Sequence, residues 1–470
     1  MLWLSPLFSL NQDEAKHLLS RVGYFYTIQD IKKLEKLNYK QAAQWVLNKT
    51  LVGGNDYSLG GGFLEFKKFR NSVLKGMGKK TNLDNEVKII NQYIKNKKLT
   101  SRQWPQEIKQ KKKAIRQFFN QEQRKFRKDL AIALLSKIKK DPLNLGHKMH
   151  LFWHNHFVSG MEKVNNLEYI FNQNQYLYQN SLGNFKSMTE YLLFDPAMVF
   201  YLDIHKSKKE KPNENFSREL LELFTMGQGN YSEKDIKELA RALTGIHFNW
   251  GKGKVVFRPN QHDQGEKTLF GEKGNFNPRD VLNVIFKQDD VSYFIAQKIW
   301  KHFVSPKIDK NMIKKMAKSF RESSYDVSVL MKTLLSDKRF YDKKYHGVLV
   351  KSPIEYMLQL EKIYEYLDVK NDNFFTNKNI IGKYKQLGFV FFNPPNVRGY
   401  QGYTKWINTA TLAVRTRFID QAKKRNMMKL NSKWKYKQLC KSLFDNSICS
   451  QKKIRQQFYM SLKSAQFQLK

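Results

Sequence analysis

The sequence has very few cysteines: Cys440 and Cys449 are the only two among 470 residues. A pair nine positions apart cannot form a disulfide framework, and it falls short of the ligand set of a structural zinc site. Long apolar runs are also absent, and a membrane-spanning helix needs about eighteen such residues in a row. The sequence therefore excludes a disulfide-stapled scaffold and predicts no membrane span.

The beginning of the chain lacks the basic residues that open an export signal. Its apolar run, MLWLSPLFSL, is short, contains Ser and Pro, and passes directly into the amphipathic pattern NQDEAKHLL. This pattern predicts a first structural element rather than a cleaved leader. We therefore expect a cytoplasmic protein.

Acidic residues are scarce relative to basic ones, 42 against 84, which gives a net charge of +42. Residues 64–140 hold 23 basic and 6 acidic residues, and the last fifty hold 13 and 1. Only 17 of the basic residues are Arg, whereas Arg dominates specific contacts with bases and phosphates. The balance favours compositional bias over a dedicated nucleic-acid role, with non-specific binding of polyanions at low salt.

Apolar residues make up 41% of the chain, which is enough for a folded core. Apolar residues at helical spacing predict a mainly α protein with one multi-helix globular core. We expect four regions along the chain. They are N-terminal helices and a Gly-rich loop (1–63), basic charged helices flanking the core (64–140), a helical core carrying the motifs (141–420), and basic C-terminal helices packing on it (421–470).

Two segments carry more specific expectations of local structure. Residues 11–24 and 27–48 each read as one helix, the second opened by a capping box from Thr27 to Asp30. Residues 246–276 lack a helical period. Within them KVVF (254–257) and KTLF (267–270) flank a polar turn and predict one small β-hairpin.

A histidine cluster is the first segment that could carry chemistry. His147, His150 and His154 share one face of a helix, and three imidazoles there could hold zinc or another divalent transition metal. His156 points elsewhere on that helix. The alternative is that the neighbouring aromatic residues pack in the core while the histidines form local hydrogen bonds.

A polar helix start at 212–222 is the second such segment. Arg218, Glu219 and Glu222 could act in a cleft as general acid, general base or metal ligands. The same side chains could equally form a buried ion-pair network that orients the helix. The polar residues that open the helix and could contact a ligand are Asn213, Glu214 and Asn215.

Two loops complete the set. In the first, 260–267, His262 and Asp263 could form a base with its carboxylate and Lys267 could bind a ligand, although Asp-x-Gly is also a plain turn.

In the second loop, 392–402, paired prolines fix the backbone, so Asn393, Asn396 and Arg398 could make ligand contacts. A structural loop that closes over the core explains this segment as well.

These four segments contain WHNHF, NENFSRELLELFTMG, HDQGEKTLFG and NPPNVRGY, in that order. Together with YLD (201–203), SPIEY (352–356) and FYMSLKSAQFQ near the end, they resemble the bacterial family catalogued as domain of unknown function 1800. That family is largely helical and has no established activity. Its members often look like partners of exported proteins that resemble sulfatases or phosphatases, which implies a partner of that kind.

The resemblance also implies that the four segments share one site. It carries over His154 and His156, whereas the family has an acidic residue in place of His147 and no histidine at 150. We expect an enzyme with a polar cleft that performs acid/base or metal-assisted hydrolysis; the alternative is a non-catalytic binding or assembly factor. The other residues that the resemblance groups are Asn213, Glu214, Arg218, Glu219, His262, Asp263, Asn393, Asn396 and Arg398.

Overall fold

The computed structural model describes residues 9–52, 105–164, 166–249, 253–366, 379–424 and 460–470. Both cysteines, the Gly-rich loop from residue 53 onward, residues 64–104 and most of the basic C-terminal region lie outside this part of the chain. Two compact units are present, residues 56–137 and the remainder. In the first, the described residues belong almost entirely to one helix, α6. The second unit contains all of the predicted site segments.

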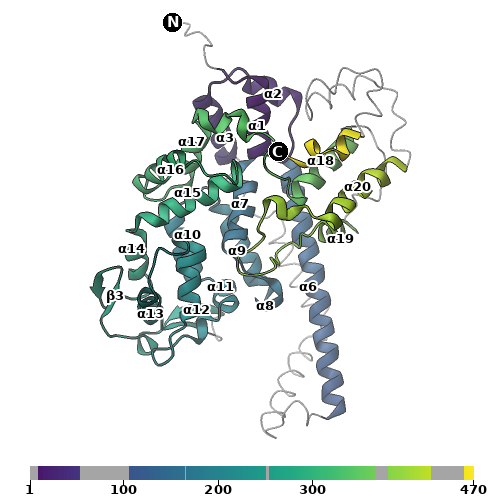
Figure 1. The fold of residues 1–470 in the computed structure, drawn as a ribbon. Coiled ribbons are helices and arrows are strands. Elements are labelled where there is room, and N and C mark those ends of the chain that lie inside the picture. Colours follow the sequence, from purple (N-terminus) through teal and green to yellow (C-terminus); the bar gives the residue numbers. More distant parts are fainter. Residues whose placement is uncertain (1–8, 53–104, 165, 250–252, 367–378, 425–459) are drawn as a thin grey trace, which may run out of the picture. The chain divides into compact units, whose positions relative to one another are not determined.

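Helices dominate the described residues, as the sequence predicts (Figure 1). None of them is long and apolar enough to cross a membrane. The α-helices are α1 (Gln12–Val22), α2 (Ile28–Leu34), α3 (Tyr39–Val52), α6 (Gln106–Lys140), α7 (Leu145–His156), α8 (Met161–Val164), α9 (Leu167–Gln179), α10 (Phe185–Leu193), α11 (Pro196–Tyr201), α12 (Glu214–Glu219), α13 (Glu233–Ala242), α14 (Asp280–Phe286), α15 (Asp289–Phe303), α16 (Lys310–Glu322), α17 (Val327–Leu335), α18 (Pro353–Tyr366), α19 (Ile380–Gln386), α20 (Thr409–Lys424) and α24 (Ala465–Gln468).

The core of the larger unit is built around two tryptophans that are fully buried. Trp153 lies on α7 and donates its indole N–H to the carbonyl of Ser181 at 2.8 Å, while Trp300 lies on α15 and donates to the carbonyl of Lys307 at 2.8 Å. Each buried ring therefore has its one polar atom satisfied. Helices α15, α16 and α17 pack one after another beside them (Figure 1). Helix α15 is therefore supported by α16, and α16 in turn by α17.

The segment predicted as one helix over 27–48 forms two helices, α2 and α3. The capping box from Thr27 to Asp30 is present and confirms the start of α2. Asn38 makes a second set of reciprocal bonds, since its side chain accepts from the amide of Gln41 and its amide donates to the Gln41 side chain. A cap inside an apolar-periodic stretch restarts the helix, which the apolar period alone does not reveal.

The region 246–276 contains two hairpins, so the prediction that KVVF pairs with KTLF is wrong. Strand β2 (Lys254–Phe257) pairs antiparallel with β1 (Ile246–Asn249), and β3 (Lys267–Leu269) pairs with β4 (Glu272–Gly274). Each strand pairs with its nearest neighbour in sequence. Short connections cost less loop-closure entropy than the nine-residue loop (258–266) that the predicted pairing needs.

One acidic residue lies in the core without a cation. Asp195 is the N-cap of α11 and accepts from the amide of Met198 at 2.8 Å and from the Gln173 side chain at 2.7 Å. It is 1% exposed. Burial raises the pKa of this carboxyl to about 7, although the two hydrogen bonds oppose the rise.

Candidate functional site

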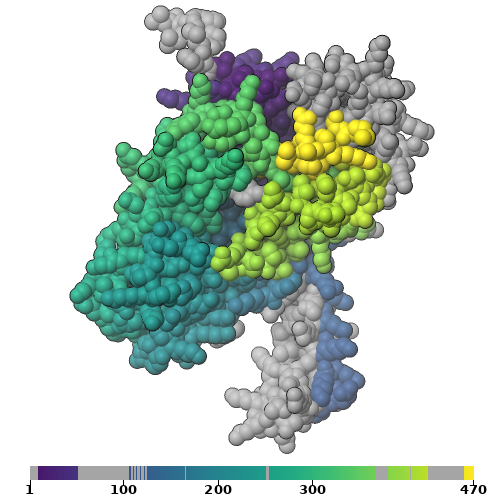
Figure 2. Space-filling view, viewed as in Figure 1, coloured from purple at the N-terminus to yellow at the C-terminus, as the bar shows by residue number. Residues whose placement is uncertain are grey.

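One partly open cavity gathers side chains from segments that lie far apart in the sequence. Its volume is about 580 Å³, within the range of roughly 300–1,000 Å³ that small-molecule sites occupy. We call it the α15 cavity. Figure 2 shows the lime-coloured segment 379–424 lying against the green and teal part of the chain, with a recess between them. Its polar or charged lining residues are Tyr24, Lys148, His154, Asn155, His156, Glu222, Gln228, Gln297, Lys298, Lys301, His302, Ser352, Glu355, Arg398, Tyr400, Gln401, Trp406 and Lys470.

The NPPNVRGY loop is fastened to the end of α7 through Asn155. The side-chain amide of Asn155 donates to the carbonyl of Tyr400 at 2.9 Å, and its oxygen accepts from the amide of Tyr400 at 2.6 Å. Gly399 has a φ of +70°, and a Cβ there would lie 2.5 Å from the carbonyl oxygen of Asn155. Glycine is therefore needed at this position on two grounds, backbone conformation and space.

His156 and Lys298 form a hydrogen-bonded pair at the cavity wall. The Nε2 atom of His156 lies 3.0 Å from the carbonyl oxygen of Phe224, and its Nδ1 atom lies 2.7 Å from Lys298 Nζ. A carbonyl only accepts, so Nε2 carries the ring proton and Nδ1 accepts from the lysine. Burial and the neighbouring Lys298 hold the pKa of His156 well below its usual range.

The carbonyls that accept hydrogen bonds from His156 and Lys298 belong to a π-helical turn, η4 (Leu220–Thr225). The amide of Met226 donates to Leu221 five residues back, at 2.8 Å. The last carbonyls of a helix have no partner inside it. Here Phe224 accepts from His156, and Leu223 accepts from Lys298 at 3.4 Å. The wide turn thus directs carbonyl oxygens at both members of the pair.

Glu222 links the second and fourth predicted segments. It accepts from Arg398 at 2.9 Å through one carboxylate oxygen and from the Tyr231 hydroxyl at 3.1 Å through the other. The i,i+4 partner in the sequence, Arg218, instead forms a two-bond pair with Glu233, at 2.8 Å for each bond. Arg218 is therefore held at the surface against α13, and Glu222 is left to face the cavity.

A second carboxylate at the cavity is buried between two lysines. Glu355 lies in the first turn of α18, forms ion pairs with Lys148 and Lys470, and caps the helix by accepting from the Ser352 amide at 2.7 Å. Burial opposes ionisation of Glu355. The two ammonium groups outweigh burial and hold its pKa well below the usual range.

Two further histidines of the lining are neutral at physiological pH. Burial lowers the pKa of His154 to about 4, and burial together with Lys470 lowers that of His302 to about 3. Within the described part of the chain, neither ring nitrogen of His154 has a hydrogen-bond partner, and the residue is 4% exposed. His154 can therefore give one donor and one acceptor to a ligand.

The donor set does not suit a metal. Among the residues that the structure describes, no group of three or more His, Cys, Asp or Glu side chains is placed to hold one. His147 lies 2.8 Å from the Tyr178 hydroxyl, and both ring nitrogens of His156 are engaged. A zinc site needs about three converging protein ligands with free lone pairs, which this cluster does not present.

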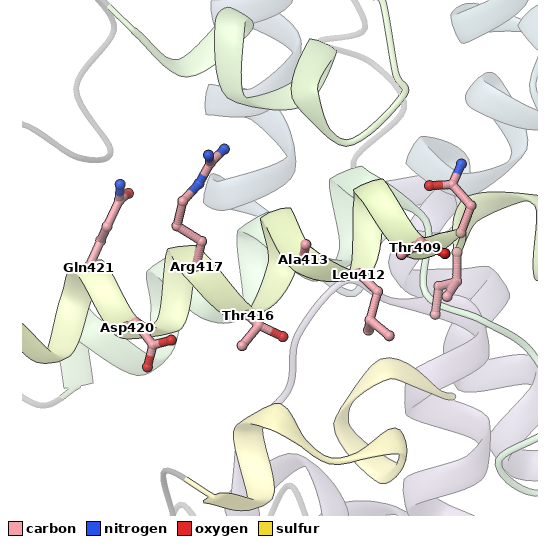
Figure 3. A pocket seen from close by; sticks show the side chains of 9 residues that line it. Thr409, Leu412, Ala413, Thr416, Arg417, Asp420 and Gln421 are labelled. Atoms are coloured by element: carbon pink, nitrogen blue, oxygen red, sulfur yellow. The ribbon is translucent and has the colours of Figure 1, made fainter.

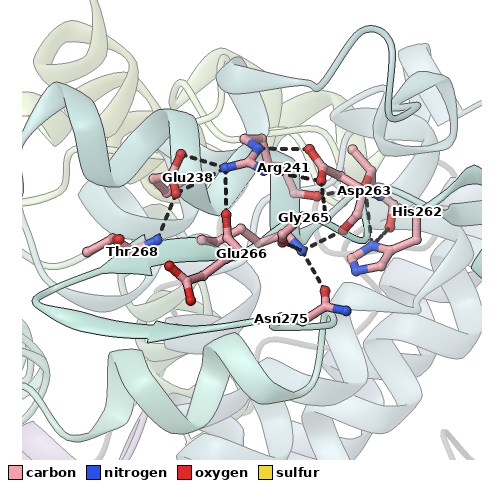
Figure 4. A network of polar contacts seen from close by, with 10 residues as sticks. Glu238, Arg241, His262, Asp263, Gly265, Glu266, Thr268 and Asn275 are labelled. Carbon is pink, nitrogen blue, oxygen red and sulfur yellow. Dashed lines mark hydrogen bonds and ion pairs between the residues drawn. The ribbon is translucent and has the colours of Figure 1, made fainter.

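The HDQGEK loop forms its own network against α13, and none of its residues lines the α15 cavity (Figure 4). His262 is 4% exposed, and its Nδ1 lies 3.0 Å from the carbonyl oxygen of Thr244. Asp263 accepts from Arg241 at 2.7 Å, and that cation lowers the pKa of the carboxyl. Lys267 donates to the carbonyls of Asp263 and Gly265. The loop still reaches solvent through Gln264, Gly265 and Glu266, whereas the side chains predicted to react make contacts within the fold.

The residues that open the second segment hold the helix in place. Asn213 caps α12 by accepting from the amide of Phe216, and it donates to the carbonyls of Leu202 and Asp203. Glu214 and Asn215 are exposed. Glu219 is half-buried, and burial and Glu222 raise its pKa. None of these four residues lines the cavity.

The asparagines of the fourth segment shape their loop. Asn393 accepts from the amide of Glu162 at 3.4 Å, and Asn396 accepts from the amide of Arg398 at 2.9 Å. The loop therefore presents Arg398 to Glu222 through its own local bonds. Of the predicted site residues, the structure brings His154, His156, Glu222 and Arg398 to one cavity.

The profile of the protein family of unknown function DUF1800 matches residues 17–468. The chain belongs to this family. The match spans nearly the whole chain and confirms the resemblance carried by the four motifs. No curated protein and no solved structure matches it.

Several lining residues were not among the predicted ones. Lysine is the commonest residue type of the chain, so a single lysine in a helix gives no signal in the sequence. Glu355 belongs to the SPIEY motif and caps its helix, but the motif gives no indication of the two lysines that meet there. The functional residues that sequence reasoning missed are Lys148, Lys298, Lys301, His302, Glu355 and Lys470.

A second, more open depression runs along α20 (Figure 3). Its charged residues already have partners, since Arg417 donates to Gln386 at 2.7 Å and Asp420 pairs with Lys463. Because no titratable group is left free there, the α15 cavity is the stronger candidate site.

Replacing His262 by alanine should lower the free energy of unfolding by about 1–3 kcal/mol, because the Thr244 carbonyl loses a buried partner. Ligand binding at the α15 cavity should be unchanged, since His262 does not line it. Urea denaturation and calorimetry measure the two effects separately. Full stability combined with lost binding would instead support one site shared by all four segments.

Proposed function

We propose that this protein binds a small anionic molecule in the α15 cavity and acts on it by acid/base chemistry. The observation that carries the proposal is the charge left over at the cavity. Both carboxylates of the lining already form ion pairs, Glu355 with Lys148 and Lys470, and Glu222 with Arg398. Lys298 and Lys301 have no ion-pair partner among the described residues.

An excess of cations in a partly open cavity favours an anion. Low-dielectric walls strengthen the attraction, and charged hydrogen bonds from lysine fix the position of a carboxylate or phosphate oxygen. Lys301 stands one turn from Lys298 on α15, and among the described residues its ammonium makes one long hydrogen bond, of 3.5 Å to Gln297. It is therefore available to a ligand oxygen.

His156 and Lys298 supply the acid and the base. The pair shares one short hydrogen bond of 2.7 Å, along which a proton can pass. Burial lowers the pKa of Lys298 to about 7, and the charge of Lys301 adds to the effect. A group with a pKa near the working pH is well suited to proton transfer. His154, neutral and unpaired, supplies hydrogen bonds to the bound molecule.

Calorimetric titration with acetate, pyruvate and inorganic phosphate tests the binding. We expect saturable binding of at least one of the three. Lys301→Met should weaken it by about tenfold or more, because a charge-assisted hydrogen bond contributes about 1.5–3 kcal/mol. The matched control is Lys318→Met on α16, whose side chain is 77% exposed and should leave the affinity unchanged.

Equal weakening by both substitutions would reduce the effect to net charge and contradict a built site. So would the absence of binding of all three anions at millimolar concentration and low salt. Low salt matters because screening weakens such contacts.

Three other expectations from the sequence stay predictions. They are a partner resembling exported sulfatases or phosphatases, salt-sensitive binding of polyanions through the basic charge, and a cytoplasmic location. The contacts at the α15 cavity support a small ligand, because its volume of about 580 Å³ fits a small-molecule site.

A further inference from the structure

We propose that Lys298 is a covalent site, whose amine adds to the carbonyl carbon of a small oxo acid to form an imine. The inference rests on the proposed function, since the acid group of the ligand would be held by the free cation of Lys301. It adds a ligand class and a reacting atom.

The hydrogen bonds of Lys298 leave one position on its nitrogen. A neutral amine has two N–H donors and one lone pair. One donor lies 2.7 Å from His156 Nδ1, and the other reaches the carbonyl of Leu223 at 3.4 Å. The lone pair has no partner among the described residues, and Lys298 lines the cavity.

The surroundings of the amine favour its neutral form. The Nζ atom lies 5.1 Å from the centre of the Phe294 ring, and Leu223 and Phe152 also line this space. Lys301 adds a like charge one turn along the helix, and burial keeps His156 neutral although its bond to Phe224 opposes this. Desolvation beside a second cation is a recognised way to activate a lysine nucleophile.

Among the lining residues that the structure describes, no cysteine or serine nucleophile competes with Lys298. The lining contains no cysteine, and its one serine, Ser352, accepts from the amide of Glu355 at 3.3 Å as a helix cap. Hydrolysis through an acyl–enzyme therefore has no residue to carry it here. An amine that attacks a carbonyl does.

The chemistry balances without an added reagent. The lone pair of Lys298 forms the C–N bond while the carbonyl π electrons move to oxygen. One amine proton passes to Nδ1 of His156, and the oxygen takes up a proton to give a carbinolamine. His156 then returns its proton to the departing hydroxyl, the nitrogen lone pair forms the C=N bond, and one water leaves. The proton on oxygen comes from solvent water and the nitrogen keeps its second N–H proton, so the products are a protonated imine and water, with no change of oxidation state.

Reductive trapping tests the proposal on the full chain. The protein is incubated with pyruvate and sodium cyanoborohydride near pH 7, and the modified lysine is located by peptide mass spectrometry. An exposed lysine with an ordinary pKa near 10.4 is almost entirely protonated there, so Lys298 should be labelled at least about tenfold faster than it. Lys298→Arg should remove the dominant adduct, and Lys318→Met should not.

Labelling spread evenly over the lysines of the folded protein would overturn the proposal. If Lys298→Arg fails to fold, His156→Gln gives a second route, because loss of the proton acceptor should slow trapping while Lys298 remains. Saturable acetate or phosphate binding without trapping rejects the imine and leaves the proposed function intact. Equal trapping of acetaldehyde and pyruvate, without any anion binding, rejects the anion site and leaves Lys298 as the reactive amine.

Discussion

Replacing Glu355 by alanine should lower the free energy of unfolding by about 3–5 kcal/mol, the usual cost of removing one partner from a buried ion pair. Two effects combine. Lys148 and Lys470 lose their common carboxylate, and the amide of Ser352 loses its cap. Lys148 is 3% exposed, so its ammonium cannot turn to water. Urea denaturation followed by circular dichroism measures the change.

The matched control is Glu190→Ala. This carboxylate pairs with Arg279 at the surface, where the side chains are 44% and 70% exposed, and its loss should cost about 0–1 kcal/mol. Lys148→Met should cost less than Glu355→Ala, because Glu355 would keep Lys470. Similar small losses for Glu355→Ala and Glu190→Ala would mean that the buried cluster contributes nothing specific.

The second large effect concerns Asp195 and pH. Its folded pKa of about 7 exceeds the ordinary value of about 4. Between these two values the folded state binds a proton that the unfolded state does not. The contribution of the Asp195 carboxyl to the free energy of unfolding is therefore fully present below about pH 4 and is lost as pH rises toward 7. Three pKa units correspond to a few kcal/mol at most.

Asp195→Asn removes the ionisable group and keeps an acceptor oxygen for the amide of Met198. The variant should match the wild type near pH 4 and exceed its stability by a few kcal/mol near pH 8. Subtracting the wild-type curve of unfolding free energy against pH from that of the variant cancels the contribution of the buried histidines. Their lowered pKa values change stability with pH in the opposite direction. Asp263→Asn is the control of opposite sign, because Arg241 lowers the pKa of Asp263. A flat difference for Asp195→Asn would show that the carboxyl is solvated.

Local sequence patterns predicted much of the fold. The mainly helical class follows from apolar spacing, and the box from Thr27 to Asp30 marks a helix start because both reciprocal bonds are encoded within four residues. The break at Asn38 was missed, since an asparagine between two apolar-periodic stretches is equally compatible with a helix surface. The hairpin partners were missed because KVVF gives no information on which strand it meets.

The candidate site was predictable only where side chains stand in recognisable motifs. His154, His156, Glu222 and Arg398 come from such motifs and line one cavity. His262 comes from an equally clear motif, yet it is buried beside Thr244. Motif spacing does not distinguish a residue that reacts from one that holds a loop in place. Lys298 contacts His156, which lies 142 positions away in the sequence. This contact arises from tertiary packing and not from a local motif.

The π-helical turn at Leu220–Thr225 makes this stretch sensitive to insertion and deletion in a way that substitution does not reveal. A π turn accommodates one residue more than an α-helical turn. Removing one residue from it would restore ordinary i→i+4 bonding and would redirect the carbonyls of the residues that remain in the turn. The apolar composition would survive, but Leu223 and Phe224 would present their carbonyls to other partners. The length of LLELFT is thus as much a determinant of the cavity as its side chains.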